Sequence, residues 1–94
     1  MIPISEALVE KEIIKAVEDL NANMKIGAIV DSSCRPGNVG FASQVLLTIM
    51  SRLEETLNII IPDNVYIFHD KASHQQLSIN EATKKLIKLA TING

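Results

Sequence analysis

Apolar residues recur with a helical period in three stretches of the chain, and each stretch predicts one amphipathic helix. The first spans residues 5–20, with Ser5 as its N-cap, and residues 21–23 are expected to end it. Its buried stripe is predicted to consist of Val9, Ile13, Ala16, Val17 and Leu20. The second spans residues 43–57 and follows the i, i+3, i+4, i+7 rule. Its stripe consists of Leu46, Ile49 or Met50, Leu53 and Leu57.

The third helix is marked by its start. Ser78 and Glu81 have the spacing of a capping box, in which each side chain accepts a hydrogen bond from the backbone N–H of the other residue. An apolar stripe follows, consisting of Ile79, Ala82, Leu86, Leu89 and Ala90. These residues predict a helix that opens directly after Ser78.

The connecting segments lack a sustained period. Residues 21–40 are predicted to form a long loop, with turn chemistry around Pro36 and Gly37, and a loop of this length in a small domain is often functional. Its apolar residues are expected to pin it across the end of the bundle; they are Met24, Ile26, Ile29 and Val30. Residues 63–76 are expected to form an irregular packed segment or one helical turn, because an isolated strand would have no partner.

Composition favours a single all-α domain over residues 1–94. The chain is 47% apolar and 21% charged, which is too apolar for disorder and too short for two ordinary domains. Only three residues are aromatic, so the core must be aliphatic. Aliphatic residues interleaved with Lys and Glu favour helices over strands.

Charge and apolar runs exclude several classes of function. The net charge is −2, and Lys84, Lys85 and Lys88 are read as a solvated face near the end of the last helix, so no nucleic-acid partner is expected. No apolar run reaches the ~20 residues of a membrane span. The acidic N-terminal stretch does not resemble a secretory leader, and one cysteine allows no intrachain disulfide, so a cytoplasmic location is expected.

Ser43 stands where a glycine-bearing loop enters the second helix. A helix N-terminus exposes unpaired N–H groups and a partial positive charge, which would stabilise a phosphate ester on this hydroxyl. The alternative is that Ser43 is only the N-cap of the helix, a role that serine often has. The residues alone favour the N-cap.

Two segments resemble a known family. The run GFASQVLLTIMSRLEETLNIIIPD resembles the acyl carrier protein pattern, in which G-x-D-S-L opens the second helix and an aliphatic helix with paired glutamates leads to I-P-D. The later run LSINEATKKLI resembles the segment that opens that family's last helix. The resemblance extends from residue 5 to about residue 92.

The resemblance implies an acyl-carrier-like four-helix bundle with a long first loop and a short third helix. It implies that Ser43 carries covalent 4′-phosphopantetheine, transferred from coenzyme A by a phosphopantetheinyl transferase. The chain would then be a cytoplasmic monomer and not an enzyme. It would deliver acyl thioesters to acyl-transferring or acyl-modifying enzymes of lipid, fatty-acid or polyketide-type metabolism. Residues Val45, Leu46, Ile49 and Met50 would line the cavity or core, and Arg52, Glu54 and Glu55 would lie among the docking residues.

Two positions depart from the family pattern and open an alternative. Ala42 replaces the acid before the serine, and Gln44 replaces the leucine after it. The acid helps the transferase to engage the carrier. The alternative is therefore a carrier-fold helical interaction module without the prosthetic group, and a helix-turn-helix DNA binder is a remote third hypothesis.

Other chemistry-bearing residues are interpreted as structural. Cys34 is predicted to be a bystander thiol, because no spacing pairs it with a histidine. His69, Asp70 and His74 could be imagined as metal ligands, but the two histidines would not share a helix face, so no metal site is expected. Glu54 and Glu55 are adjacent and would diverge on a helix, which excludes a convergent acid–base pair.

Overall fold

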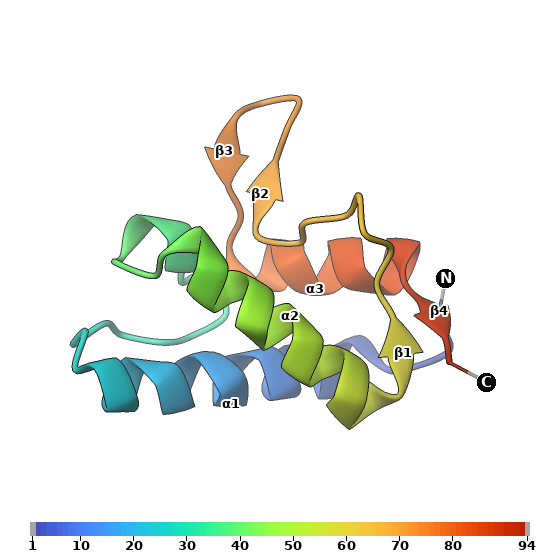
Figure 1. Ribbon diagram of the computed structural model, residues 1–94, viewed down its shortest axis with the longest axis horizontal. Helices are drawn as coiled ribbons and strands as arrows, with labels where there is room; N and C mark the ends of the chain where they lie inside the picture. The colour runs from blue at the N-terminus through green and yellow to red at the C-terminus, as the bar shows by residue number, and fades with distance from the viewer. Residues whose placement is uncertain (1, 94) are drawn as a thin grey trace.

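The computed structural model describes residues 2–93 and is mostly helical (Figure 1). The described chain forms three α-helices, one short 3₁₀ turn and four two-residue strands. In chain order these are α1 (Glu6–Met24), η1 (Pro36–Asn38), α2 (Ser43–Leu57), β1 (Ile59–Ile60), β2 (His69–Asp70), β3 (Gln75–Gln76), α3 (Ile79–Leu89) and β4 (Thr91–Ile92).

Helix α1 begins as predicted but is longer. The Ser5 hydroxyl accepts a hydrogen bond from the Leu8 N–H at 3.1 Å, which confirms the N-cap. The helix continues through residues 21–23, where it was expected to end. The Asn21 side chain does not compete for the backbone hydrogen bonds of the helix. That amide instead pairs with both backbone groups of Ala28, at 2.9 and 3.0 Å, and holds the returning loop. The end comes at Lys25, whose φ of 53° is left-handed.

Helix α2 has the predicted bounds, and its buried residues are Leu46, Ile49, Met50 and Leu53. It packs across α1, which also contacts α3, so the three helices enclose one core (Figure 1). Asn58 ends α2 with a left-handed φ of 53°, a conformation that asparagine adopts more readily than most residues. Leu57 is only half-buried.

Helix α3 carries the predicted capping box. The Ser78 hydroxyl accepts from the Glu81 N–H at 3.1 Å, and a Glu81 carboxylate oxygen accepts from the Ser78 N–H at 2.9 Å. The predicted stripe is buried except at Leu89, which is 39% exposed. Leu89 is the last helical residue, and the chain leaves it in an extended conformation toward β4, so its side chain stays partly exposed.

The segment between α2 and α3 contains paired strands, whereas a strand there was expected to have no partner. β1 pairs antiparallel with β4, and β2 pairs antiparallel with β3, with His69 opposite Gln76. Residues 65–68 are irregular, as predicted, and Ile67 and Phe68 are fully buried. Within residues 58–78 no helix forms, and the β2–β3 hairpin projects from the bundle where a short third helix was implied (Figure 1).

The first loop is only partly pinned to the bundle. Ile26 and Val30 pack against the core, whereas Ile29 is 85% exposed and Met24 is 47% exposed, so the expectation is wrong for those two residues. Cys34 is buried further along the same loop. No helix within residues 2–93 is long and apolar enough to cross a membrane.

Candidate functional site

Ser43 is the first residue of α2 and is not its N-cap. Ala42 occupies the N-cap position with an extended backbone and provides no capping side chain. The interpretation of Ser43 as only an N-cap is therefore wrong, because its side chain lies one residue too far into the helix. Ser43 is exposed, and among residues 2–93 no group hydrogen-bonds to its hydroxyl.

The backbone around Ser43 leaves donors available. The N–H groups of Val45 and Leu46 both donate to the Ala42 carbonyl, at 3.0 and 3.1 Å. In the described chain the N–H groups of Ser43 and Gln44 have no backbone acceptor. Free N–H groups at a helix N-terminus, together with the helix dipole, favour a bound anion. The Ser43 hydroxyl thus lies where a phosphate ester is electrostatically favourable.

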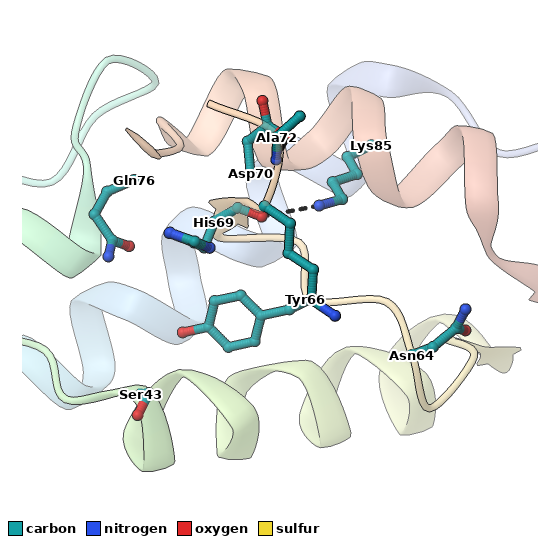
Figure 2. Close-up of a pocket in the computed structure, with 9 residues that line it drawn as sticks. Ser43, Asn64, Tyr66, His69, Asp70, Ala72, Gln76 and Lys85 are labelled. Atoms are coloured by element: carbon teal, nitrogen blue, oxygen red, sulfur yellow. Dashed lines mark hydrogen bonds between the residues drawn. The ribbon is translucent and has the colours of Figure 1, made fainter. Parts of the chain in front are cut away.

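A cavity of about 540 Å³ opens beside Ser43, and we call it the Ser43 cavity. Its walls come from the start of α2, the irregular segment after β1, the β2–β3 hairpin and α3 (Figure 2). The lining residues are Ser43, Asn64, Tyr66, His69, Asp70, Lys71, Ala72, Gln76 and Lys85. The cavity therefore depends on tertiary contacts between segments up to 42 positions apart in the sequence.

Three half-buried polar side chains of the wall form no hydrogen bond with another residue of the described protein. The Tyr66 hydroxyl, the His69 imidazole and the Gln76 amide make no hydrogen bond to any other group in residues 2–93. The Gln76 Oε1 atom is buried without a donor. Figure 2 shows all three side chains around the space above Ser43. Buried polar groups are normally paired, and among these three side chains the exception is the Gln76 Oε1 atom, which lies against Gly37.

The charges of the cavity are mainly cationic. Lys85 donates from Nζ to the His69 carbonyl at 2.9 Å (Figure 2), and Lys71 also lines the wall. The carboxylate of Asp70 faces local donors: the Ser73 hydroxyl bonds to it at 2.7 Å and the Ala72 N–H at 3.2 Å. These bonds, and to a lesser degree the charge of Lys85, lower the pKa of Asp70.

Packing fixes the aromatic wall. The Tyr66 ring meets the buried Phe68 ring edge-to-face, with 6.2 Å between centroids. Burial raises the pKa of the Tyr66 hydroxyl, so this group remains a neutral donor and acceptor at physiological pH. The tyrosine can therefore donate to a ligand oxygen or accept from a ligand N–H.

The hairpin is held over the cavity by a polar cluster. Arg35 donates from Nη1 to the Gln76 carbonyl at 2.6 Å and to a Glu81 oxygen at 2.9 Å, which joins the first loop to β3 and α3. Gly37 lies so close to the Gln76 amide that a Cβ atom on this glycine would overlap it. The amide end of the Gln76 side chain thus packs against the first loop.

The residues expected to line the cavity or the core belong to the core. Leu46, Ile49 and Met50 are buried there, and Val45 is half-buried and packs against it; none of the four lines the Ser43 cavity. Lys84 and Lys88 are exposed as predicted, but Lys85 turns toward the cavity, so the reading of all three as a solvated face is wrong for Lys85.

The three predicted docking residues differ in their environments. Arg52 forms an ion pair with Asp19 of α1 at 2.9 Å. A Glu54 oxygen accepts from the Ile61 N–H at 2.9 Å and so organises the exit from α2. Glu55 is exposed.

The residues considered for other chemistry do not converge. Cys34 is buried, and desolvation, assisted by the Asp31 carboxylate, raises the pKa of its thiol, which is the opposite of what a reactive cysteine needs. His69 lies on β2, and His74 directly precedes β3. Residues 2–93 contain no cluster of three metal-ligating side chains.

Sequence reasoning singled out Ser43 but did not single out Tyr66, Gln76 or Lys85, which line the same cavity. A signal was present in the polar run HDKASHQQ, which is too polar for a core element and is flanked by buried residues on both sides. That signal could mark a projecting hairpin. It could not show that the hairpin faces Ser43.

The chain matches no protein-family model, no curated protein and no solved structure.

Proposed function

We propose that the chain is an acyl carrier protein that bears 4′-phosphopantetheine on Ser43 and serves lipid, fatty-acid or polyketide-type metabolism. The observation that carries this proposal is the Ser43 hydroxyl, which is exposed and unbonded at the N-terminus of α2 and lies at the edge of a cavity. The resemblance of residues 40–63 and 77–87 to the carrier pattern supports the same assignment.

The residues at the site fit the group. The free N–H groups of Ser43 and Gln44 would hold the phosphodiester, with Lys71 and Lys85 contributing positive charge from the cavity wall. The group supplies a terminal thiol that carries acyl chains as thioesters. The role of this chain is to present that thiol to partner enzymes, so it needs no catalytic residue of its own.

Attachment requires a separate transferase. The Ser43 Oγ forms a bond to the pantetheine-side phosphorus of coenzyme A, and the pyrophosphate P–O bond breaks. Adenosine 3′,5′-bisphosphate leaves, and the hydroxyl proton passes to a base of the transferase. Ala42 removes the acid that this family usually offers to the transferase, so we expect slow modification by an ordinary transferase.

The proposed fold is a divergent carrier bundle. Helices α1, α2 and α3 correspond to the first, second and last helices of the carrier pattern, and the β2–β3 hairpin replaces its short third helix. This substitution would give the protein a partner-recognition surface different from that of an ordinary carrier.

Mass spectrometry tests the proposal directly. The purified chain is incubated with coenzyme A, Mg²⁺ and a broad-specificity phosphopantetheinyl transferase, and the expected product gains one phosphopantetheine. Ser43→Ala should abolish the gain, whereas Ser51→Ala, a change at an exposed serine of the same helix, should retain it. No gain in the unchanged chain, or a gain that survives Ser43→Ala, refutes the assignment.

A second function is favoured by Ala42 itself. A carrier-fold interaction module without the prosthetic group would remain unmodified even when Ala42→Asp restores the acid. It would also bind its partner when Ser43 is alanine. Faster modification of the Ala42→Asp variant than of the unchanged chain supports the carrier instead.

A further inference from the structure

The first loop is anchored to the N-terminus of α3 by its own backbone. The Ile79 N–H donates to the Cys34 carbonyl and the Asn80 N–H donates to the Ser32 carbonyl, both at 2.9 Å. Two of the donors that a helix N-terminus leaves free are thereby occupied. The part of the loop that precedes residue 35 is therefore fixed to α3, whereas the N-terminus of α2 at Ser43 stays open.

Arg35 directly follows this anchored part and connects it to η1. Its Nη1 atom donates to the Gln76 carbonyl of β3 at 2.6 Å and to a Glu81 oxygen of α3 at 2.9 Å. Its own carbonyl accepts from the Asn38 N–H at 2.8 Å, inside η1. Gly37 of η1 lies against the amide end of the Gln76 side chain. Arg35 thus joins the hairpin and α3 to the turn that enters α2.

The path from η1 to Ser43 is short and packed. Pro36 and Phe41 are both buried, and the Pro36 carbonyl accepts from the N–H groups of Val39 and Phe41, each at 3.3 Å. Ala42, the N-cap of α2, follows Phe41 directly, and η1 also packs against α2. Because packed residues cannot move independently, a shift of η1 is carried to the first turn of α2.

We infer that Arg35 is a positioning residue for the modification of Ser43: by tying η1 to β3 and α3, it holds the first turn of α2 in the arrangement that the transferase binds. This inference rests on the proposed function. Arg35 acts through η1 and not on the Ser43 hydroxyl, to which no group in residues 2–93 bonds. A loosened loop would have to be ordered again when the transferase binds. The KM for the chain would then rise while kcat stayed the same, because the bound complex is unchanged.

Arg52 provides a matched control for Arg35. Each arginine forms an ion pair of 2.9 Å, and the side chains are 44% and 47% exposed for Arg35 and Glu81, against 40% and 52% for Arg52 and Asp19. The Arg52 pair joins α2 to α1 and has no bond to the first loop. Replacing either arginine by methionine keeps an unbranched apolar side chain and removes the donors. The two variants therefore differ in whether the loop is released.

Hydrogen exchange of backbone amides, followed by NMR, measures how firmly the loop is held. In Arg35→Met the amides of Asn38 and Phe41 should exchange about three- to thirtyfold faster than in the unchanged chain. They should exchange normally in Arg52→Met, and the Val9 amide of α1 should be unaffected in both. Arg35→Lys keeps a charged donor and should restore most of the protection. Arg35→Gln replaces Arg35→Met if that variant proves too unstable.

The kinetics of phosphopantetheine transfer measure the effect on Ser43. With coenzyme A and the broad-specificity transferase, Arg35→Met should raise the KM for the chain about two- to tenfold and leave kcat unchanged. Arg52→Met should change neither constant, and Arg35→Lys should return the KM toward that of the unchanged chain. A role of Arg35 in stability alone would not separate the two arginines in this assay.

Two results overturn the inference: equal exchange of the η1 amides in the two methionine variants, or a loosened loop with an unchanged KM. A chain that is modified equally well with and without Arg35 retains the proposed function and loses this inference. A chain that is never modified loses the carrier function, and the exchange measurement then decides by itself whether Arg35 holds the start of α2.

Discussion

Glu81 provides the sharpest test of how the hairpin is held over the cavity. Its carboxylate completes the capping box of α3 by accepting from the Ser78 N–H at 2.9 Å, and it accepts from Arg35 at the same distance. The cap contributes about 1 kcal/mol to the free energy of unfolding. The ion pair joins side chains that are 44% and 47% exposed, so it contributes about 0.2–1 kcal/mol. Glu81→Ala should therefore cost about 1–2 kcal/mol.

Urea and thermal unfolding, followed by circular dichroism, measure this cost. For a domain of this size, 1–2 kcal/mol corresponds to a Tm lower by about 5–15 °C. Glu81→Gln keeps an oxygen for the cap and removes the charge, so it should cost about half as much. The control is Glu55→Ala, which changes an exposed glutamate of α2 and should stay within about 0.5 kcal/mol of the unchanged chain. A Glu81→Ala variant as stable as Glu55→Ala would refute the reasoning.

The same carboxylate gives the stability a pH dependence of known sign. The hydrogen bond from the Ser78 N–H, followed by smaller contributions that include the Arg35 charge, lowers the pKa of Glu81 below its ordinary value. A lowered pKa means that the stabilisation is complete above the ordinary glutamate pKa of about 4.3 and is lost as the pH falls through the folded-state pKa. The stability difference between the unchanged chain and Glu81→Gln should therefore be larger at pH 7 than at pH 3. An increase toward acid would contradict the assigned contacts.

Three further predictions concern the core, the loop and the thiol. Leu53→Ala empties a site that is 1% exposed and should lower the free energy of unfolding by about 2–5 kcal/mol in urea melts. Gly37→Ala places a methyl group against the amide end of the flexible Gln76 side chain, which can rotate away, so it should cost at most about 1 kcal/mol; a loss of about 3 kcal/mol would show that this side chain cannot move. The Cys34 thiol is 7% exposed and has a raised pKa, so at pH 7 a disulfide reagent should modify it much more slowly in the native chain than in urea; equal rates would contradict its burial.

Local signals predicted the helices well, because caps and apolar periodicity act within a few residues. The bounds of α2 and the capping box at Ser78 agree with the prediction. The end of α1 was placed too early because asparagine is a common helix terminator, and the chain does not reveal that Asn21 binds the backbone of Ala28, seven residues away. Leu89 fitted the apolar stripe, but its exposure depends on where the chain goes after α3.

The sequence by itself determined the helical segments, the aliphatic core and the position of Ser43 at the start of α2, because these follow from short-range periodicity and composition. Only the tertiary structure decided the surroundings of Ser43. The pairing of β2 with β3, and the approach of Tyr66, Gln76 and Lys85 to one cavity, depend on contacts between segments far apart in the chain. Such contacts leave no period in the sequence, since each polar residue of the wall is equally compatible with a solvated loop. The fold brings these residues together because Ile67 and Phe68 are buried beneath them, which draws the polar residues that flank this pair over the start of α2.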